Sequence, residues 1–281
     1  LGREGPSIQL GAMASKGFSR LMGAGKTEEK VLLTCGASAG LSAAFNAPIA
    51  GVLFSLEEIH KHFSPELLLS TMASSITADF ISRNVFGLKP IFNFQIDGQI
   101  PLHIYGHVIL LGVILGFLGV VYNTSLSKSQ DLYQKIPSQT ARLMIPFLLA
   151  GVLGFAYPAV LGGGHPLVLS SGEMLLGALF FLLVMKFIFS MISFGSGAPG
   201  GIFLPLLVLG AIIGSIYYNA VGLVTDSLNG LLGNFIILGM AGYFSAIVRA
   251  PITGIILISE MTGSLSQLLT LSIVSLAAYV I

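Results

Sequence analysis

The chain repeats part of its own sequence once, and both copies place Gly and Pro inside apolar segments. GREGPSIQLGA at positions 2–12 matches GIFLPLLVLGA at 201–211, with five identities in eleven positions. SAAFNAPIAG at 42–51 matches SAIVRAPITG at 245–254. The two matches keep their order and have offsets of 199 and 203 residues. They therefore indicate two halves of one duplicated unit.

The composition is that of an integral membrane protein. Hydrophobic residues make up 54% of the 281 residues and charged residues 9%, whereas soluble domains average about 25% charged residues. A net charge of +1 gives no reason to expect a nucleic-acid partner. The single Cys35 excludes a disulfide framework, and the His residues form no zinc-binding set, so we expect no metal and no cofactor. In such a chain, duplicated halves with matching helix breaks are typical of transporters.

The apolar segments predict an all-α fold in which some helices are broken. They run at about 33–58, 64–86, 103–126, 141–160, 172–194, 203–223, 231–248, 250–262 and 264–281. Several are long enough to cross a bilayer, which takes about 20 residues. Pro48 and Pro251 divide two of the segments into pieces of about 12–16 residues, which are too short to span. Polar connections are expected at 13–32 and 124–142, and an interfacial loop at 87–101.

The two Gly-Pro turns predict anion sites at helix N-termini. Pro6 and Pro205 each precede an apolar run, and Pro is favoured at the first position of a helix. The unpaired amides there, together with the positive end of the helix dipole, attract an anion. The glycines of the two turns remove side chains that would keep an ion from the backbone.

Glu4 lies within the first of these turns. An ionisable side chain at membrane depth is costly and therefore suggests a function. Its carboxylate can occupy the place of the anion and should leave that place when it is protonated, which links proton binding to anion binding. The alternative is a static ion pair between Glu4 and its neighbour Arg3.

At this point the residues resemble a known family. The GREGP, GIFLP and AFNAPIAG motifs at 2–6, 201–205 and 44–51 are similar to those of the CLC chloride channels and proton-coupled chloride antiporters. The Glu57-Glu58 pair and the EMT sequence at 260–262 fit as well. The resemblance implies an inverted-repeat bundle of tilted and broken helices, normally a homodimer with one ion pathway per subunit.

The resemblance also implies the extent of the two repeats. Residues 1–86 are expected to be the C-terminal part of the first repeat, with the anion turn at 2–6 and the broken helix at 33–58. Residues 103–281 are expected to be the second repeat. Its anion turn is at 201–205 and its broken helix at 231–262. Together they form one membrane domain that we interpret as truncated at both ends.

Individual roles carry over to the matching positions. Glu4 matches the family's external gating glutamate, and Glu58 matches its internal proton glutamate. Anion coordination is expected from six backbone amides, those of Arg3, Glu4, Gly5, Ile202, Phe203 and Leu204. At the 203-residue offset Glu57 aligns with Glu260, so this shared acid is expected to be structural and to pair with a helix end or a base. Glu58 aligns with Met261, so the second acid of the pair occurs in only one of the two halves.

Two elements of the family pattern are absent. The chain begins after the upstream turn whose serine contacts the central anion, and it stops before the helix that supplies a tyrosine hydroxyl. A preference for chloride over nitrate therefore cannot be read from this sequence.

The leading hypothesis is a chloride/proton antiporter, not an enzyme, in the plasma membrane or a bacterial inner membrane. Its partners are chloride ions, protons and the lipid bilayer. A passive, voltage- or pH-gated chloride channel of the same fold is the alternative, and fluoride-exporting relatives match the motifs less well. A membrane enzyme would need a nucleophile–base pair or a metal cluster, and neither is found in the sequence. Homodimer contacts are expected around 38–58, 64–86 and 250–281.

Two further motifs need an interpretation. GSGAPG at 195–200 fits a dinucleotide-binding pattern in its letters, but a long apolar run precedes it and no acid follows until Asp226, so we interpret it as structural. Lys186 lies within an apolar run and needs a partner, either Glu173 or a helix carbonyl.

Overall fold

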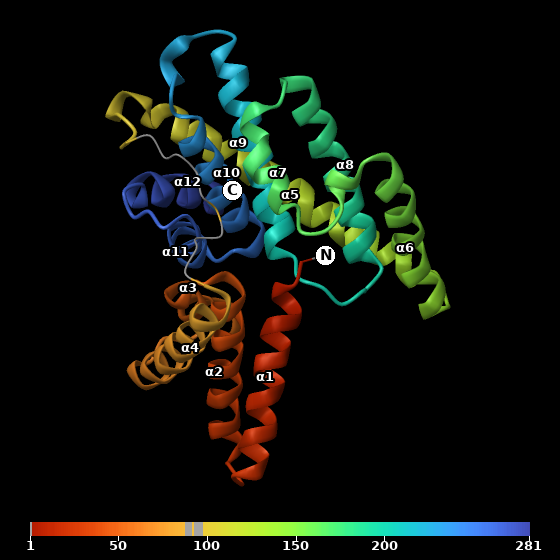
Figure 1. The fold of residues 1–281 in the computed structure, drawn as a ribbon, viewed down its shortest axis with the longest axis vertical. Helices are drawn as coiled ribbons and strands as arrows, with labels where there is room; N and C mark the ends of the chain where they lie inside the picture. Colours follow the sequence, from red (N-terminus) through yellow and green to blue (C-terminus); the bar gives the residue numbers. More distant parts are fainter. Residues whose placement is uncertain (1, 88–91, 93–97) are drawn as a thin grey trace. The chain divides into compact units, whose positions relative to one another are not determined.

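The computed structural model describes residues 2–87, 92 and 98–281 (Figure 1). The described residues form helices and no strand, apart from one isolated β-bridge. The α-helices are α1 (Glu4–Leu21), α2 (Lys26–Phe45), α3 (Pro48–Phe54), α4 (Pro65–Phe86), α5 (Tyr105–Gln134), α6 (Gln139–Ala156), α7 (His165–Ser170), α8 (Leu176–Gly195), α9 (Phe203–Gly222), α10 (Leu232–Val248), α11 (Pro251–Thr262) and α12 (Leu268–Val280).

The chain divides into two compact units. The larger comprises Leu1–Gly2, Phe94–Pro251 and Leu269–Ile281, and the smaller comprises Arg3–Asn93 and Ile252–Leu268. The larger unit thus holds α5 to α10 and most of α12, while the smaller holds α1 to α4 and nearly all of α11.

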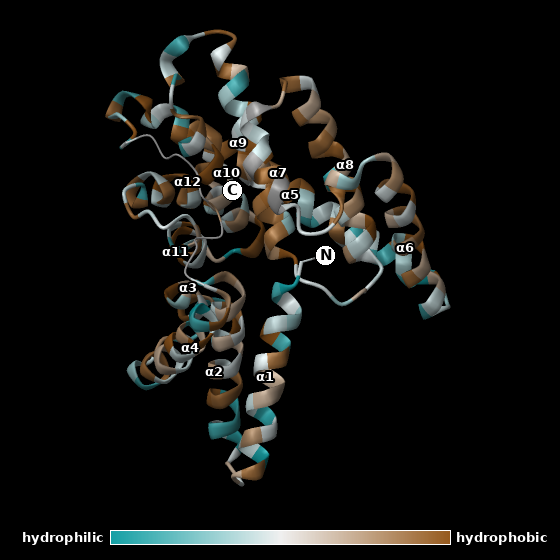
Figure 2. Ribbon diagram, viewed as in Figure 1, coloured by the Kyte–Doolittle hydropathy of each residue, from teal (hydrophilic) through white to brown (hydrophobic). Residues whose placement is uncertain are grey.

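Four of the described helices are long and apolar enough to cross a membrane. They are α5 with the 3₁₀ turn before it (Leu102–Gln134), α6, α8 and α9. Figure 2 shows how strongly apolar residues dominate α9 and α10. The three C-terminal helices are apolar but shorter, between 10 and 17 residues. Long spans and short apolar helices together make the broken-helix membrane fold that the sequence predicts.

Helices α1 and α2 of the smaller unit pack together through glycines. A Cβ on Gly11 would collide with the backbone carbonyl of Gly36, and a Cβ on Gly40 would collide with the carbonyl of Ser7. Small residues therefore allow the two backbones to touch, as in many membrane helix pairs.

Helices α9 and α10 of the larger unit pack in the same way. A Cβ on Gly210 would collide with the carbonyl of Gly239. Gly210 lies 199 residues after Gly11, and Gly239 lies 203 residues after Gly36, which are the two offsets of the sequence repeat. The duplicated halves therefore share a backbone contact as well as a motif.

Both predicted helix breaks are confirmed. Helices α2 and α10 are followed by the C-cap residues Asn46 and Arg249, and both residues adopt the left-handed conformation, with φ of 51° and 65°. A proline opens the following helix in each case, at Pro48 and Pro251. Left-handed backbone is uncommon in residues other than Gly, and these two residues stand 203 positions apart, so the repeat preserves backbone geometry where it does not preserve the side chain.

The expected polar connections are much shorter than predicted. Helix α1 continues to Leu21 and α2 starts at Lys26, so most of 13–32 is helical. Helix α5 continues to Gln134, which leaves a short link before α6 at Gln139. The ends of these helices carry charged side chains that solvent or headgroups can meet; Lys16 and Glu29, for example, pair at 3.9 Å between α1 and α2. The charged residues in these two segments therefore lie mainly at the ends of helices and not in loops. The predicted loop at 87–101 lies largely outside the described residues.

Candidate anion and proton site

The two Gly-Pro motifs are joined at their first residues. The Gly2 amide donates to the Gly201 carbonyl and the Gly201 amide donates to the Gly2 carbonyl, both at 2.7 Å. This pair is the isolated β-bridge, and both of its residues belong to the larger unit. The starts of the two motifs therefore lie side by side.

A helix begins two residues after each of these glycines. Glu4 opens α1 and Phe203 opens α9. The preceding residues, Arg3 and Ile202, adopt similar helical conformations, and neither uses its side chain to cap the helix. Helical geometry leaves first-turn amides without intrahelical acceptors, and both turns carry the positive end of a helix dipole. The motifs are thus equivalent in geometry as well as in sequence.

Glu4 is the charged residue at these turns with a buried side chain. It is 1% exposed, and neither carboxylate oxygen makes a hydrogen bond within the described residues. It forms no ion pair with Arg3, whose side chain is exposed, so the static pair considered as an alternative is not found. A buried acid without a hydrogen-bond partner is costly, and functional sites are where such a cost is tolerated.

Glu57 and Glu58 lie in a π-helical segment, Ser55–His60, that continues α3. Glu57 accepts hydrogen bonds from the amides of Ile252 (3.3 Å) and Thr253 (2.9 Å) and from the Thr253 hydroxyl (2.8 Å). It therefore caps the N-terminus of α11, which confirms the structural role expected of the shared acid. The π-helix was not foreseen; such segments are rare and often occur at functional sites.

Glu58 is half-buried and makes no hydrogen bond or ion pair within the described residues. Nearby His60 is already engaged, since its Nδ1 lies 3.3 Å from the Thr34 hydroxyl. Of the two adjacent acids, one is held by three hydrogen bonds and the other remains available.

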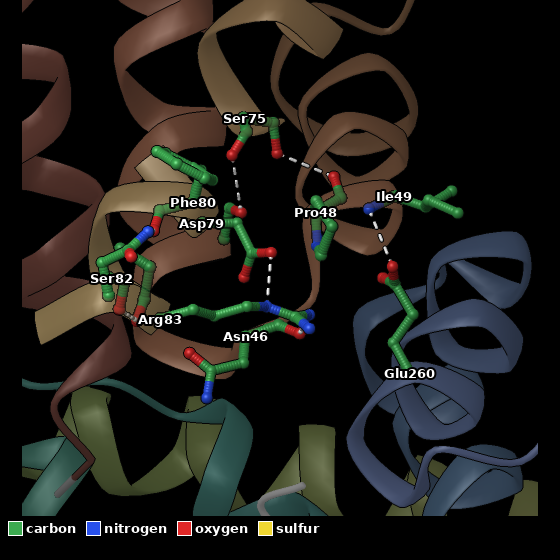
Figure 3. Close-up of polar contacts among 12 residues, drawn as sticks. Asn46, Pro48, Ile49, Ser75, Asp79, Phe80, Ser82, Arg83 and Glu260 are labelled. Atoms are coloured by element: carbon green, nitrogen blue, oxygen red, sulfur yellow. Dashed lines mark hydrogen bonds and ion pairs between the residues drawn. The ribbon is translucent and has the colours of Figure 1, made fainter. Parts of the chain in front are cut away.

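Glu260 repeats the contact of Glu57 in the opposite direction. It accepts hydrogen bonds from the amides of Ile49 (3.1 Å) and Ala50 (2.7 Å) at the start of α3 (Figure 3). Every residue of these contacts lies in the smaller unit. We call the two caps together the glutamate clasp. The offset of 203 residues relates Ile49 to Ile252 and Ala50 to Thr253, as it relates Glu57 to Glu260.

A polar cluster that sequence reasoning missed supports the first helix break. Asp79 and Arg83 of α4 form an ion pair at 2.6 Å, and the Arg83 Nη2 donates to the Asn46 carbonyl at 3.0 Å (Figure 3). The Ser75 hydroxyl donates to the Pro48 carbonyl at 2.7 Å. The spacing of an acid and a base four residues apart in an apolar helix was the signal available in the sequence.

The second break is supported differently. Arg249 itself donates to the Tyr279 carbonyl at 2.8 Å, and its guanidinium lies 4.4 Å from the centre of the Tyr279 ring. The repeat thus keeps the bend but stabilises it with different side chains.

The remaining sequence motifs are structural. In the turn that ends α8, the Ser196 hydroxyl donates to the Ser193 carbonyl at 2.7 Å and accepts the Ala198 amide at 3.2 Å. Lys186 donates to the carbonyls of Val160 and Gly162, each at 2.7 Å. Carbonyls, one of the two kinds of partner considered, are therefore found at this lysine, and the side chain of Glu173, the other candidate, lies outside the described residues.

These features define the class of protein: an all-α integral membrane protein of the inverted-repeat type, with paired Gly-Pro turns. The chain belongs to the voltage gated chloride channel family, whose model matches residues 1–281.

The relatives that this chain matches are longer proteins. The H⁺/Cl⁻ exchange transporter ClcA of Yersinia pestis is 35% identical over 100% of this chain, and that of Salmonella arizonae is 33% identical over 99%. The chain spans 61% of the length of each.

Solved structures agree in fold. A slow cyanobacterial Cl⁻/H⁺ antiporter is similar with a TM-score of 0.91 and 30% identity, covering 99% of this chain and 67% of that one. A CLC-type fluoride/proton antiporter has a TM-score of 0.84 at 23% identity and covers 100% and 69%. At that identity the second likeness supports the fold alone.

Proposed function

We propose that this chain belongs to a transporter that exchanges chloride for protons across a membrane. The observation that carries the proposal is Glu4, a buried acid without a hydrogen-bond partner within the described residues. It lies in the first turn of a helix, two residues after Gly2, which pairs with Gly201. The relatives named as chloride/proton exchangers support the same substrates.

In this proposal backbone amides hold the anion. Partial charges at helix N-termini bind an anion without trapping it, which conduction requires. The equivalent conformations of Arg3 and Ile202 support contributions from both turns. The amides assigned to the anion are those of Arg3, Glu4, Gly5, Ile202, Phe203 and Leu204.

Glu4 acts as the gate. Its carboxylate competes with chloride for the amides, because both are negatively charged and both are attracted to the N-terminus of a helix. Protonation makes the side chain neutral, removes its attraction to the helix N-terminus and releases the place to chloride. Each proton taken up at Glu4 is then linked to a change in anion occupancy, which is the basis of exchange.

Glu58 passes protons between the cytoplasm and Glu4. The contrast with Glu57 supports this role: Glu57 is used as a helix cap, whereas Glu58 keeps its carboxylate available in an irregular π-helical segment. A passive channel needs no acid at this position.

We further propose that residues 1–86 and 103–281 are parts of two inverted repeats in one membrane domain. The glutamate clasp supports this, because its two halves are related by the same offset as the sequence motifs. The protein works as a transporter rather than an enzyme, as a homodimer embedded in lipid, in a plasma membrane or a bacterial inner membrane.

The test is reconstitution of the full-length protein in vesicles with chloride efflux and external pH recorded together. Exchange predicts that a chloride gradient drives protons against their own gradient, in a fixed ratio to chloride. Chloride movement with no proton movement would support the passive channel instead, and an absence of chloride movement would refute both.

A further inference from the structure

Lys186 is a buried cation in the middle of a membrane span. It lies within α8, a candidate span with a mean hydropathy of 2.2, and its side chain is 1% exposed. The two ion pairs of the described residues, Lys16–Glu29 and Arg83–Asp79, do not include it. A charge inside the membrane is costly and is usually paired or functional.

Within the part of the chain that the structure describes, backbone dipoles hold the ammonium. Its hydrogen bonds to the carbonyls of Val160 and Gly162 are both 2.7 Å long, which is typical of charge-assisted bonds. Val160 ends a 3₁₀ turn, Pro158–Val160, so one bond is made at the negative end of a short helical turn. Because carbonyls are neutral groups, these two contacts solvate the positive charge of Lys186 but do not cancel it.

The Lys186 ammonium lies next to Gly163 and Gly164, a segment that packs against the start of α9. A Cβ on Gly164 would lie 3.3 Å from the Lys186 Nζ and 3.1 Å from both methyl groups of Val208. A Cβ on Gly163 would lie 2.5 Å from the Leu204 side chain. The glycines therefore form a thin layer, without side chains, between the ammonium and the first two turns of α9. All of these residues lie in the larger unit.

That part of α9 follows the second anion turn. Val208 is five residues beyond Phe203, or about 7.5 Å along the helix axis. The ammonium is thus on the order of 10 Å from the first-turn amides, with apolar protein and glycine backbone between them. At an effective dielectric constant of about 20, a unit charge at this distance changes the affinity for an anion on the order of tenfold.

We propose that Lys186 supplies a fixed positive charge that strengthens anion binding at the turn 201–205, acting through the glycine layer without touching the ion. The proposal deepens the proposed function and rests on it. A lysine within the pathway would risk trapping chloride, whereas a charge held behind the helix raises the affinity of the amides and leaves the ion free to move. Lys186 therefore acts on the anion indirectly, through its charge, and does not bind it.

The test measures chloride binding to the purified full-length protein by calorimetry, together with its thermal unfolding. Lys186→Gln keeps N–H donors for the two carbonyls but removes the charge. We expect it to weaken chloride binding on the order of tenfold, while Lys186→Arg stays close to wild type. Lys135→Gln removes an exposed lysine at the end of α5 and serves as the control for loss of net charge.

A merely structural role predicts another pattern. Lys186→Gln would then lower thermal stability and leave the chloride dissociation constant of the folded protein unchanged, and that result overturns the proposal. If Lys186→Gln does not fold, Lys186→His replaces it, because histidine titrates between pH 5 and 8. Its chloride affinity must fall more steeply than that of wild type as pH rises, and equal slopes overturn the proposal. A wild-type protein that binds no chloride refutes the proposed function itself.

Discussion

Glu57 and Glu260 each cap the N-terminus of the helix that leads to the other glutamate. Glu57 accepts from the amides of Ile252 and Thr253 at the start of α11, and Glu260 accepts from those of Ile49 and Ala50 at the start of α3. Neither cap is local: the partners are between 195 and 211 residues apart in the chain. The clasp satisfies first-turn amides that helical geometry leaves unpaired.

We first predict that the clasp stabilises the fold. Glu57→Gln and Glu260→Gln each weaken a charged acceptor that serves two amides, and each should lower the free energy of unfolding by about 1–3 kcal/mol. Glu58→Gln changes an adjacent acid that has no partner within the described residues and should cost less than about 0.5 kcal/mol. Thermal or denaturant unfolding of purified protein measures the three. Equal stability of Glu57→Gln and Glu58→Gln would contradict the clasp.

The second prediction concerns Glu4. Glu4→Gln keeps the shape of the side chain but removes the group that titrates, and so imitates permanent protonation. Chloride flux should persist, while proton coupling and its dependence on pH disappear. Flux and pH recordings from vesicles check this, and unchanged coupling in Glu4→Gln would falsify the gating role.

The third prediction separates the two adjacent acids by function. Glu58→Gln should leave chloride transport in place and abolish coupled proton movement, because the relay loses its titratable group. Glu57→Gln should reduce the amount of folded protein but leave the ratio of chloride to protons unchanged in what remains. Tightly coupled exchange in Glu58→Gln would show that protons take another route.

The prediction for Glu57 came from the sequence, whereas the clasp did not. The repeat showed that this acid is shared by both halves, and shared residues are more simply structural. The partner lay beyond reach, because the capped amides are almost 200 residues away and no local pattern connects them to Glu57. The sequence repeat and its two prolines similarly predicted the helix breaks, but not the different side chains that support them at Asn46 and Arg249.

Helix lengths were the weakest part of the sequence prediction. Charged residues in 13–32 were interpreted as a connection, yet α1 and α2 occupy nearly all of it. Lys and Glu have good helix propensity, so a polar segment at the membrane boundary continues a helix as readily as it ends one. Asp79 and Arg83 were missed for a different reason: the segment 64–86 was predicted from its apolar residues alone, although a spacing of four places this acid and this base together on a helix.

The fourth prediction compares two glycines of α1. Gly11→Ala should destabilise the protein, since its Cβ would meet the backbone of Gly36, which cannot move aside as a side chain can. Gly17→Ala places its Cβ in open space and should be neutral or stabilising by up to about 1 kcal/mol, because Ala favours the helix. Thermal unfolding of both variants tests this prediction, and a Gly11→Ala variant as stable as wild type would argue against the close α1–α2 contact.

The fifth prediction concerns the homodimer. Residues 64–86 include α4, where Ile76 is 52% exposed, and we expect a second copy to cover such apolar positions. In a Cys35→Ala background, Ile76→Cys should cross-link subunits through a bifunctional thiol reagent. Val121→Cys on α5 is exposed to a similar degree, 51%, and should not. Cross-linking at Val121 in preference to Ile76 would place the dimer contact elsewhere.

The clasp also constrains the order in which the protein is completed during synthesis. Helix α3 emerges from the ribosome before α11, and the carboxylate that caps it belongs to Glu260, more than 200 residues later. Until then the amides of Ile49 and Ala50 have to be satisfied by water or by a temporary partner. The smaller unit is thus completed only once α11 has been made, and a nascent chain that stops before α11 leaves α3 without its cap.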